Sequence, residues 1–308
     1  MRIEICDVGP RDGLQIERRS LPTEDKIRLV EGLVAAGLRR VQVTSFVSPR
    51  AVPQLADAEA VLAGLEKPPG VVFNALVPNR RGAERAAETS VDEFGLFVSA
   101  SETHNAKNMN APIAAILDGF REVARIAEEA GKRLVGGVAT AFGCPFEGDV
   151  PPEAVLRIAR VYRDLGAQEL NLGDTTGMAT PATVRRLLAA LREAVPELRV
   201  TLHFHNTRGV GLANVMVGLD EGVTSYDASI GGLGGCPFAA GATGNICTED
   251  LVYLLQESGH ETGVDLDRLI DVALDLQRAL GRELPGQVMK AGPRLRLHPA
   301  EAVATADG

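Results

Sequence analysis

The chain has 308 residues, of which 45% are hydrophobic and 24% are charged, and its formal net charge is -9. This composition is typical of a globular protein with a large core, and we expect one domain over residues 1–296 and a flexible tail over 297–308. A net negative charge without any Lys and Arg cluster argues against nucleic acid as a partner. No apolar run reaches the ~20 residues of a membrane helix, and no signal-peptide core is present, so we expect a cytoplasmic protein that does not enter a membrane.

The four cysteines indicate neither a disulfide framework nor a zinc site. Cys6, Cys144, Cys236 and Cys247 show no Cys-x-x-Cys spacing. Such spacing is usual in zinc knuckles, and disulfide-rich domains are short and secreted. We therefore expect free thiols, with Cys144 in a structural position.

A recurring pattern predicts alternating helices and strands. An amphipathic segment ends at a small residue or Gly and is followed by a short β-branched run, as at Gly37 before Val41. Gly after a helix favours the left-handed conformation that ends it. The pattern predicts eight strands, near residues 2–6, 40–44, 71–76, 93–98, 133–139, 169–173, 199–204 and 225–229. Eight βα units favour a closed (β/α)8 TIM barrel over an open doubly wound sheet, because no Gly-x-Gly-x-x-Gly follows the first strand.

One further helix is expected after the eighth unit. Apolar residues recur at helical spacing between Val264 and Leu280. We expect this C-terminal helix to pack on the barrel or on a partner copy, and we expect the chain to form a homo-oligomer.

Polar residues that follow the predicted strands are the candidates for chemistry. In a TIM barrel the loops after the strands form the active-site face. The residues concerned are Asp7, Arg11, Asp12, Gln42, Thr44, Asn74, Ser99, Glu102, Asp174, Thr175, His203 and His205.

The segment His203-Phe204-His205 is the most informative of these. Residues i and i+2 of a strand point to the same face, roughly 6.5–7 Å apart, so two imidazoles can bind one ion. Asp12 should lie close to them once the barrel closes. An Asp, two His and an amide or water oxygen suit Mg or Mn better than structural Zn. The alternative is that one His fills the barrel and the other is a hydrogen-bonded surface residue.

The segment Arg11-Asp12-Gly13 follows the first strand and has two interpretations. It can be a charged β-turn with Arg11 in solvent. In combination with the histidines we favour Asp12 as a metal ligand, with Arg11 as a fixed cation beside a developing enolate oxygen.

A glycine-rich segment, residues 231–244, follows the eighth predicted strand. Many glycines in one loop have an entropic cost without a gain in packing, and we interpret the segment as a mobile lid over the barrel mouth. Cys236 lies within it, either as a small lid residue or as a proton donor that acts when the lid closes.

These motifs together resemble the 3-hydroxy-3-methylglutaryl-CoA lyase family, which is related to isopropylmalate and homocitrate synthases. The resemblance covers roughly residues 2 to 280, and its most specific part is the Gly-Gly-Cys-Pro loop followed by Gly-Asn. The segments concerned are Val8–Gln15, Thr44–Pro49, Ser99–Glu102, Leu172–Thr175, His203–His205, Gly231–Asn245 and Thr248–Tyr253.

The resemblance implies a division of roles among the candidates. Asp12, His203, His205 and Asn245 are then the ligands of a divalent metal, Mg or Mn. Arg11 steadies an enolate, Cys236 is a mobile acid and base, and Arg18 contacts coenzyme A. Gln42 and Asp174 are further catalytic candidates, and Ser99 is a further candidate for binding the cofactor. The implied reaction is the retro-Claisen cleavage of 3-hydroxy-3-methylglutaryl-CoA to acetyl-CoA and acetoacetate.

Three positions depart from the family pattern, which usually has Glu at Gln42, Asn at Ile16 and Asp at Asn206. An amide cannot act as a carboxylate base, so a related 3-hydroxyacyl-CoA such as citramalyl-CoA is an alternative substrate. A synthase-type acyltransferase would need a 2-keto acid acceptor. A non-catalytic paralogue would bind an acyl-CoA without turnover.

Overall fold

Eight parallel strands form a closed barrel in the order β1 to β8. The computed structural model describes residues 1–235 and 244–297. Each strand pairs with the next, and β8 pairs with β1, so the described sheet closes on itself. The strands are β1 Glu4–Asp7, β2 Arg40–Ser45, β3 Val72–Leu76, β4 Glu93–Ser99, β5 Arg133–Ala139, β6 Glu169–Asp174, β7 Arg199–Phe204 and β8 Ser225–Ala228. The prediction of a (β/α)8 TIM barrel is confirmed.

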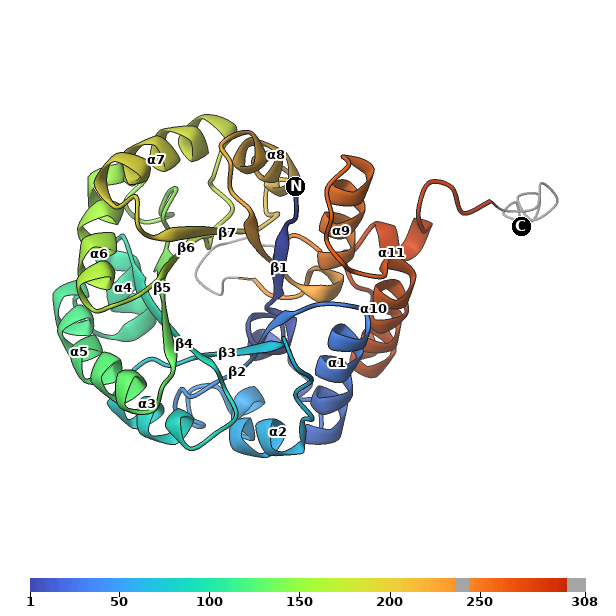
Figure 1. Cartoon of the computed structure of the whole chain (residues 1–308), viewed down its shortest axis with the longest axis horizontal. Coiled ribbons are helices and arrows are strands. Elements are labelled where there is room, and N and C mark those ends of the chain that lie inside the picture. The colour runs from blue at the N-terminus through green and yellow to red at the C-terminus, as the bar shows by residue number, and fades with distance from the viewer. Residues whose placement is uncertain (236–243, 298–308) are drawn as a thin grey trace.

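Helices form a ring around this barrel (Figure 1). α5 shows why, because its buried residues Phe120, Val123 and Ile126 recur at a spacing of three and form one apolar stripe. The ring consists of α1 Thr23–Ala35, α2 Ala58–Gly64, α3 Arg80–Ala87, α4 Glu102–Met109, α5 Ile113–Glu129, α6 Pro152–Asp164, α7 Pro181–Ala194, α8 Gly211–Asp220 and α9 Thr248–Glu257.

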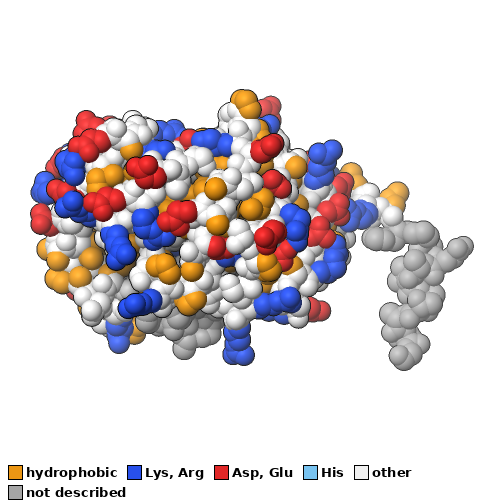
Figure 2. Space-filling view, turned by 90° about the horizontal axis from the view of Figure 1, so that it is seen from below, with side chains coloured by type: hydrophobic (Ala, Val, Ile, Leu, Met, Phe, Trp, Pro, Cys, Tyr) orange, Lys and Arg blue, Asp and Glu red, His pale blue; other side chains and the backbone are white. Residues whose placement is uncertain are grey.

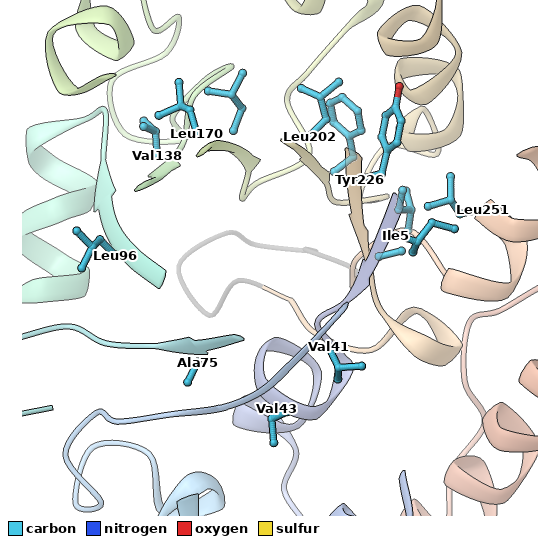
Figure 3. Close-up of a cluster of buried hydrophobic side chains, with 14 of the residues drawn as sticks. Ile5, Val41, Val43, Ala75, Leu96, Val138, Leu170, Leu202, Tyr226 and Leu251 are labelled. Carbon is cyan, nitrogen blue, oxygen red and sulfur yellow. The ribbon is translucent and has the colours of Figure 1, made fainter. Parts of the chain in front are cut away.

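The main core lies between the barrel and the helices. Figure 3 shows apolar side chains of the strands, among them Val41, Leu96, Val138 and Leu170, pointing away from the barrel axis. Because side chains alternate along a strand, the residues between them face the interior of the barrel. Many of those inward positions carry polar, charged or small residues, such as Gln42, Gly95 and Gly137, and a cavity remains there for a site.

The C-terminal segment adds α10 Leu266–Leu280 and α11 Val288–Ala291 beside the barrel. α10 is capped at its start by Asp265, whose carboxylate accepts a bond from the Arg268 N–H at 3.1 Å, and at its end by Gly281, where φ is 69°. Its apolar face packs against α1 (Figure 1). The expected C-terminal helix is therefore confirmed, and it packs on the barrel of its own chain.

On the face in Figure 2, acidic and basic side chains are intermingled. None of the helices that the structure describes has the length and apolarity needed to cross a bilayer. Cys6, Cys144 and Cys247 are buried free thiols, as predicted. Cys236 and residues 298–308, which form most of the expected tail, lie outside the described residues, and the single-domain boundaries stay a prediction.

Candidate active site

Arg11 and Asp12 lie in a tight turn directly after β1. This turn is a short π-helix, η1 (Gly9–Gly13), in which the N–H groups of Asp12 and Gly13 both approach the Val8 carbonyl, at 2.7 and 3.3 Å. Gly9 is required here because a Cβ atom at this position would lie 2.7 Å from Cγ2 of Ile230. Single π turns of this kind are frequent at functional sites. The turn places Asp12, which is buried, at the carboxyl end of the barrel.

The two histidines converge on Asp12, as their spacing predicts. His203 lies on β7 and His205 directly after it, and their Nε2 atoms are 3.2 Å apart. Asp12 Oδ2 lies 3.8 Å from His205 Nε2. The three side chains can each offer a ligand atom, with all three atoms within 4.8 Å of one another.

Asn245 joins this cluster from the segment that follows β8. Its backbone forms an isolated antiparallel bridge with His205. Its Nδ2 donates to Asp12 Oδ2 at 2.8 Å and to the Leu233 carbonyl at 3.0 Å. Both of these partners are acceptors, so the remaining side-chain oxygen, Oδ1, is buried without a hydrogen-bond partner among the described residues. Gly234, at φ 106°, permits this approach, since a Cβ there would lie 2.5 Å from Asn245 Nδ2.

The donor set fits a divalent cation. Two ring nitrogens that face each other at 3.2 Å cannot both bear hydrogen, and a shared cation satisfies both. A carboxylate and an unpartnered amide oxygen are suitable hard ligands beside them. Burial alone would raise the pKa of Asp12, but Arg11 and the two imidazoles lower it to about 2, so the carboxylate is ionised.

Asp227 contacts the Nδ1 side of the His203 ring, and Asn171 bonds to Asp227. The sequence analysis identified neither as a site residue. Asp227 Oδ2 lies 3.0 Å from His203 Nδ1 and accepts a bond from Asn171 Nδ2 at 2.6 Å. Bonding at Nδ1 directs Nε2 toward His205, as is common for metal-binding histidines. Burial by itself lowers the pKa of His203, but the bond to Asp227 raises it above its ordinary value. The available signal was position, because Asp227 pairs with His203 in the sheet.

Arg11 is held by an acceptor on each side. Its Nη1 donates to Asp12 Oδ1 at 2.7 Å, and its Nε donates to Gln42 Oε1. Gln42 in turn donates to Asn74 Oδ1 at 2.7 Å, and Gln15 donates to Asp12 Oδ1 at 2.9 Å. Gln42 therefore faces the barrel interior, opposite to Val41 and Val43, as its place on the strand predicts.

These residues line one cavity of about 270 Å³ at the barrel mouth. Arg11, Asp12, Gln42, His203 and His205 all contribute to its wall. His104 also lines it and was not predicted. This cavity is the space in which an acyl group could meet the candidate metal ligands.

Several other candidates lie away from this cluster. Asp174 does not line the cavity; its Oδ1 accepts bonds from the N–H groups of Met178 and Ala179 at 2.7 and 2.9 Å, and burial raises its pKa to about 7. Ser99 is buried with its Oγ 2.6 Å from His104 Nδ1. Arg18 is exposed after η2 (Leu14–Ile16). Cys236 and the central part of the expected lid, residues 236–243, lie outside the described residues.

A known protein family matches most of this chain. Residues 2–275 match the HMGL-like family. The chain belongs to the HMGL-like family. The resemblance to 3-hydroxy-3-methylglutaryl-CoA lyases, drawn from the motifs, is therefore confirmed.

The relatives in this family cover nearly the whole chain. Hydroxymethylglutaryl-CoA lyase YngG of Bacillus subtilis is 44% identical over 93% of this chain and 96% of its own length. The 3-hydroxy-3-isohexenylglutaryl-CoA/hydroxy-methylglutaryl-CoA lyase of Pseudomonas aeruginosa is 43% identical over 94% of this chain and 97% of its own length. An HMG-CoA lyase from Acinetobacter baumannii, solved with coenzyme A and 3-methylmalate, is 45% identical and covers 97% of both chains, with a TM-score of 0.92.

Proposed function

We propose that this chain is a metal-dependent carbon–carbon lyase that cleaves 3-hydroxy-3-methylglutaryl-CoA to acetyl-CoA and acetoacetate. The supporting observation is the convergence of Asp12, His203 and His205 beside Arg11 in one cavity. Family membership supports the same reaction, because relatives of 40–44% identity bear the name of this lyase.

The metal would be held by Asp12, His203, His205 and Asn245. We propose Mg or Mn, since the set combines two imidazoles with two oxygen donors and contains no thiolate. When bound, the ion supplies positive charge that stabilises negative charge on substrate oxygen. Asp227 and Asn171 contribute by holding the His203 ring in one orientation.

Arg11 is the residue that we assign to the enolate. Cleavage of the bond between C2 and C3 leaves negative charge on the thioester oxygen of the acetyl-CoA fragment. A guanidinium has five N–H donors, and bonds to Asp12 and Gln42 fix its plane while leaving donors for the substrate. A cation that is already positioned needs no rearrangement as the charge develops.

The proton balance needs a group that takes the 3-hydroxyl proton and one that returns a proton to C2. We propose Cys236 as the acid and base, on the resemblance of its Gly-Gly-Cys-Pro segment to the lyase family. Arg18 and Ser99 stay predictions as contacts to coenzyme A. Asp174 stays a catalytic prediction, and its bonds to Met178 and Ala179 also suit a residue that shapes the loop after β6.

The test is a product assay on the purified protein loaded with Mg or Mn. The protein should release acetyl-CoA and acetoacetate in equal amounts from 3-hydroxy-3-methylglutaryl-CoA, with no second substrate. A requirement for a 2-keto acid would instead indicate a synthase. Tight binding without turnover would indicate a non-catalytic acyl-CoA-binding protein.

The substrate range, the number of subunits and the cellular location are finer parts of the same proposal. The panel should include citramalyl-CoA, because Gln42 stands where the lyase pattern has Glu. A homo-oligomer and a cytoplasmic location stay predictions. Light scattering on the purified protein measures the number of subunits.

A further inference from the structure

A second group of candidate metal ligands lies at the start of α9, in addition to the set at the barrel mouth. Cys247, Glu249 and Asp250 each offer one ligand atom, and the three atoms lie within 4.8 Å of one another. Cys247 directly precedes α9, and the two acidic residues lie in its first turn. Cys247 is 7% exposed, Asp250 is 8% exposed, and Glu249 is completely buried. Three groups that can each bear negative charge are thus gathered largely out of contact with water.

Hydrogen bonds hold both carboxylates in place. Asp250 Oδ1 accepts a bond from the Val288 N–H at 2.7 Å, where α11 begins. Glu249 Oε2 accepts a bond from the Gly231 N–H at 3.0 Å, in the short turn η4 (Ile230–Gly232) that opens the glycine-rich segment. α9 and α11 lie against each other beside the barrel (Figure 1). The backbone of two other segments therefore fixes two of the three groups.

The second oxygen of Glu249 has no such partner. Oε1 is buried and makes no hydrogen bond among the described residues. Protonation does not remedy this, because a hydroxyl at Oε1 would need an acceptor in its turn. A buried polar atom without a partner is costly, and an ion or a water molecule is the usual explanation. A water molecule would satisfy Oε1 but would not offset the negative charge of its neighbours, whereas a cation would do both.

Glycines leave the sulfur and this oxygen unobstructed. A Cβ on Gly286 would lie 2.2 Å from Glu249 Oε1, and a Cβ on Gly232 would lie 2.5 Å from Cys247 Sγ. Ligand atoms bound to one zinc ion lie roughly 3–4 Å apart, since Zn–S bonds are about 2.3 Å and Zn–O bonds about 2.1 Å long. Side-chain adjustments of about 1 Å would therefore bring the three atoms onto one ion.

The N-terminus of α9 explains only part of this arrangement. Carboxylates in the first turn of a helix are stabilised by the helix dipole. Asp250 fits that account, because its oxygens also bond to backbone N–H groups. The dipole does not explain why Glu249 Oε1 is left without a partner or why a buried thiol lies beside the two carboxylates.

We propose that Cys247, Glu249 and Asp250 bind a second divalent cation, and that this ion is zinc. One thiolate and two carboxylates suit Zn, whereas Mg and Mn favour sites made of oxygen ligands. A water molecule would complete the tetrahedron, and the thiol proton is released to solvent when the ion binds. Cys-x-x-Cys spacing does not reveal such a site, because two of its three ligands are carboxylates.

The role of this ion is structural. The Cys247 backbone forms a parallel bridge with Ser229 at the end of β8, and Asn245 lies two residues earlier in the chain. The ion would join the start of the glycine-rich segment to α9 and, through Asp250, to α11. It is independent of the cation proposed at the barrel mouth and takes no part in the proposed reaction.

The experiment uses Co²⁺ as a spectroscopic probe for zinc. A thiolate bound to Co²⁺ gives an intense charge-transfer absorption in the near ultraviolet, which carboxylates and imidazoles do not give. His205→Ala is the background, because it weakens the site at the barrel mouth. Titration of this metal-free variant with Co²⁺ should produce the thiolate band, and Zn²⁺ should abolish it by displacing Co²⁺.

Further variants in that background locate the band. Cys247→Ala should abolish it and weaken Co²⁺ binding by more than about 100-fold, since residues behind metal ligands already change affinity by about 10- to 100-fold. Glu249→Gln should weaken binding by at least about 10-fold. Cys144→Ala removes another buried thiol and is the matched control, and it should keep the band. Cys236→Ala should also keep it, which excludes a thiolate from the glycine-rich segment.

Thermal unfolding gives a second readout. Zn²⁺ should raise the unfolding midpoint of His205→Ala, because the ion binds only the folded protein, and should not raise it when Cys247→Ala is added. If Cys247→Ala does not fold, as judged by circular dichroism, Glu249→Gln decides in its place.

Two results would overturn the second site. One is the absence of a thiolate band in His205→Ala, and the other is a band that survives Cys247→Ala or disappears with Cys236→Ala. Cleavage of 3-hydroxy-3-methylglutaryl-CoA by the parent protein is measured separately, so this inference and the proposed reaction can fail independently.

Discussion

Two polar clusters lie inside the same barrel, and they differ in how far their charged and polar groups pair with one another. At the base, Arg40, Glu93 and Glu169 are each the first residue of a strand, and positive groups there meet negative groups at 2.8–2.9 Å. At the mouth, the His203 and His205 nitrogens face each other at 3.2 Å, and Asn245 Oδ1 has no partner among the described residues. The base satisfies its own charges, whereas the mouth is complete only with a ligand.

We therefore assign stability to the base and chemistry to the mouth. TIM barrels commonly divide the two faces in this way. Variants at the two ends should therefore fail in different ways.

The largest effect is expected for Cys236→Ala. If this thiol moves the proton, kcat should fall by about 10²- to 10⁴-fold, while binding of acyl-CoA changes little. Stopped assays for kcat and calorimetry for binding separate the two. A kcat equal to that of the parent would show that Cys236 has no proton-transfer role.

Arg40→Met tests the base. Removing one partner of a buried ion pair typically costs about 3–5 kcal/mol, because the remaining charges stay buried, so denaturant unfolding should shift strongly. The folded fraction should still bind Mn. Arg121→Met, at an exposed pair with Asp118, is the matched control and should change stability by less than about 1 kcal/mol. Equal losses in the two variants would contradict a structural role for the base.

His205→Ala tests the mouth, where we expect a loss of metal binding without a loss of stability. Affinity for Mn should fall by at least about 100-fold, more than the 10- to 100-fold typical of residues behind the ligands, and the unfolding midpoint without metal should hardly move. Calorimetry and denaturant unfolding give the two numbers. Retained metal affinity would mean that the ligand assignment is wrong.

The smallest effect is expected for Gln42→Glu. A carboxylate should bind Arg11 more strongly than the amide does, but it would also oppose the Asn74 oxygen that Gln42 now contacts. We expect a change of about 10- to 100-fold in relative kcat/KM, toward 3-hydroxy-3-methylglutaryl-CoA and away from other acyl-CoA esters. If the ratio across the panel does not move, Gln42 has no part in specificity, and Ile16 becomes the next residue to change.

Much of the mouth follows from local sequence rules. The i, i+2 spacing of His203 and His205 places both rings on one face of a strand, whatever surrounds them. Asp12 follows a predicted strand, and in a parallel barrel all strand ends meet on one side. The strand boundaries were also predicted to within two residues, because each βα unit has its own periodicity and several helices end at a glycine with positive φ, such as Gly37, Gly131 and Gly166.

Tertiary structure alone decided which distant residues contact one another. Asp227 looks like an ordinary strand residue until the pairing of β7 with β8 sets it beside His203. Asp174 follows a strand just as Asp12 does, yet its carboxylate bonds to Met178 and Ala179 and not to the cavity. Gly95 and Val135 likewise pair in the closed sheet, although forty residues separate them in the chain. Periodicity determines the face on which a side chain lies, but register and closure determine what it meets there, and those depend on packing summed over the whole barrel.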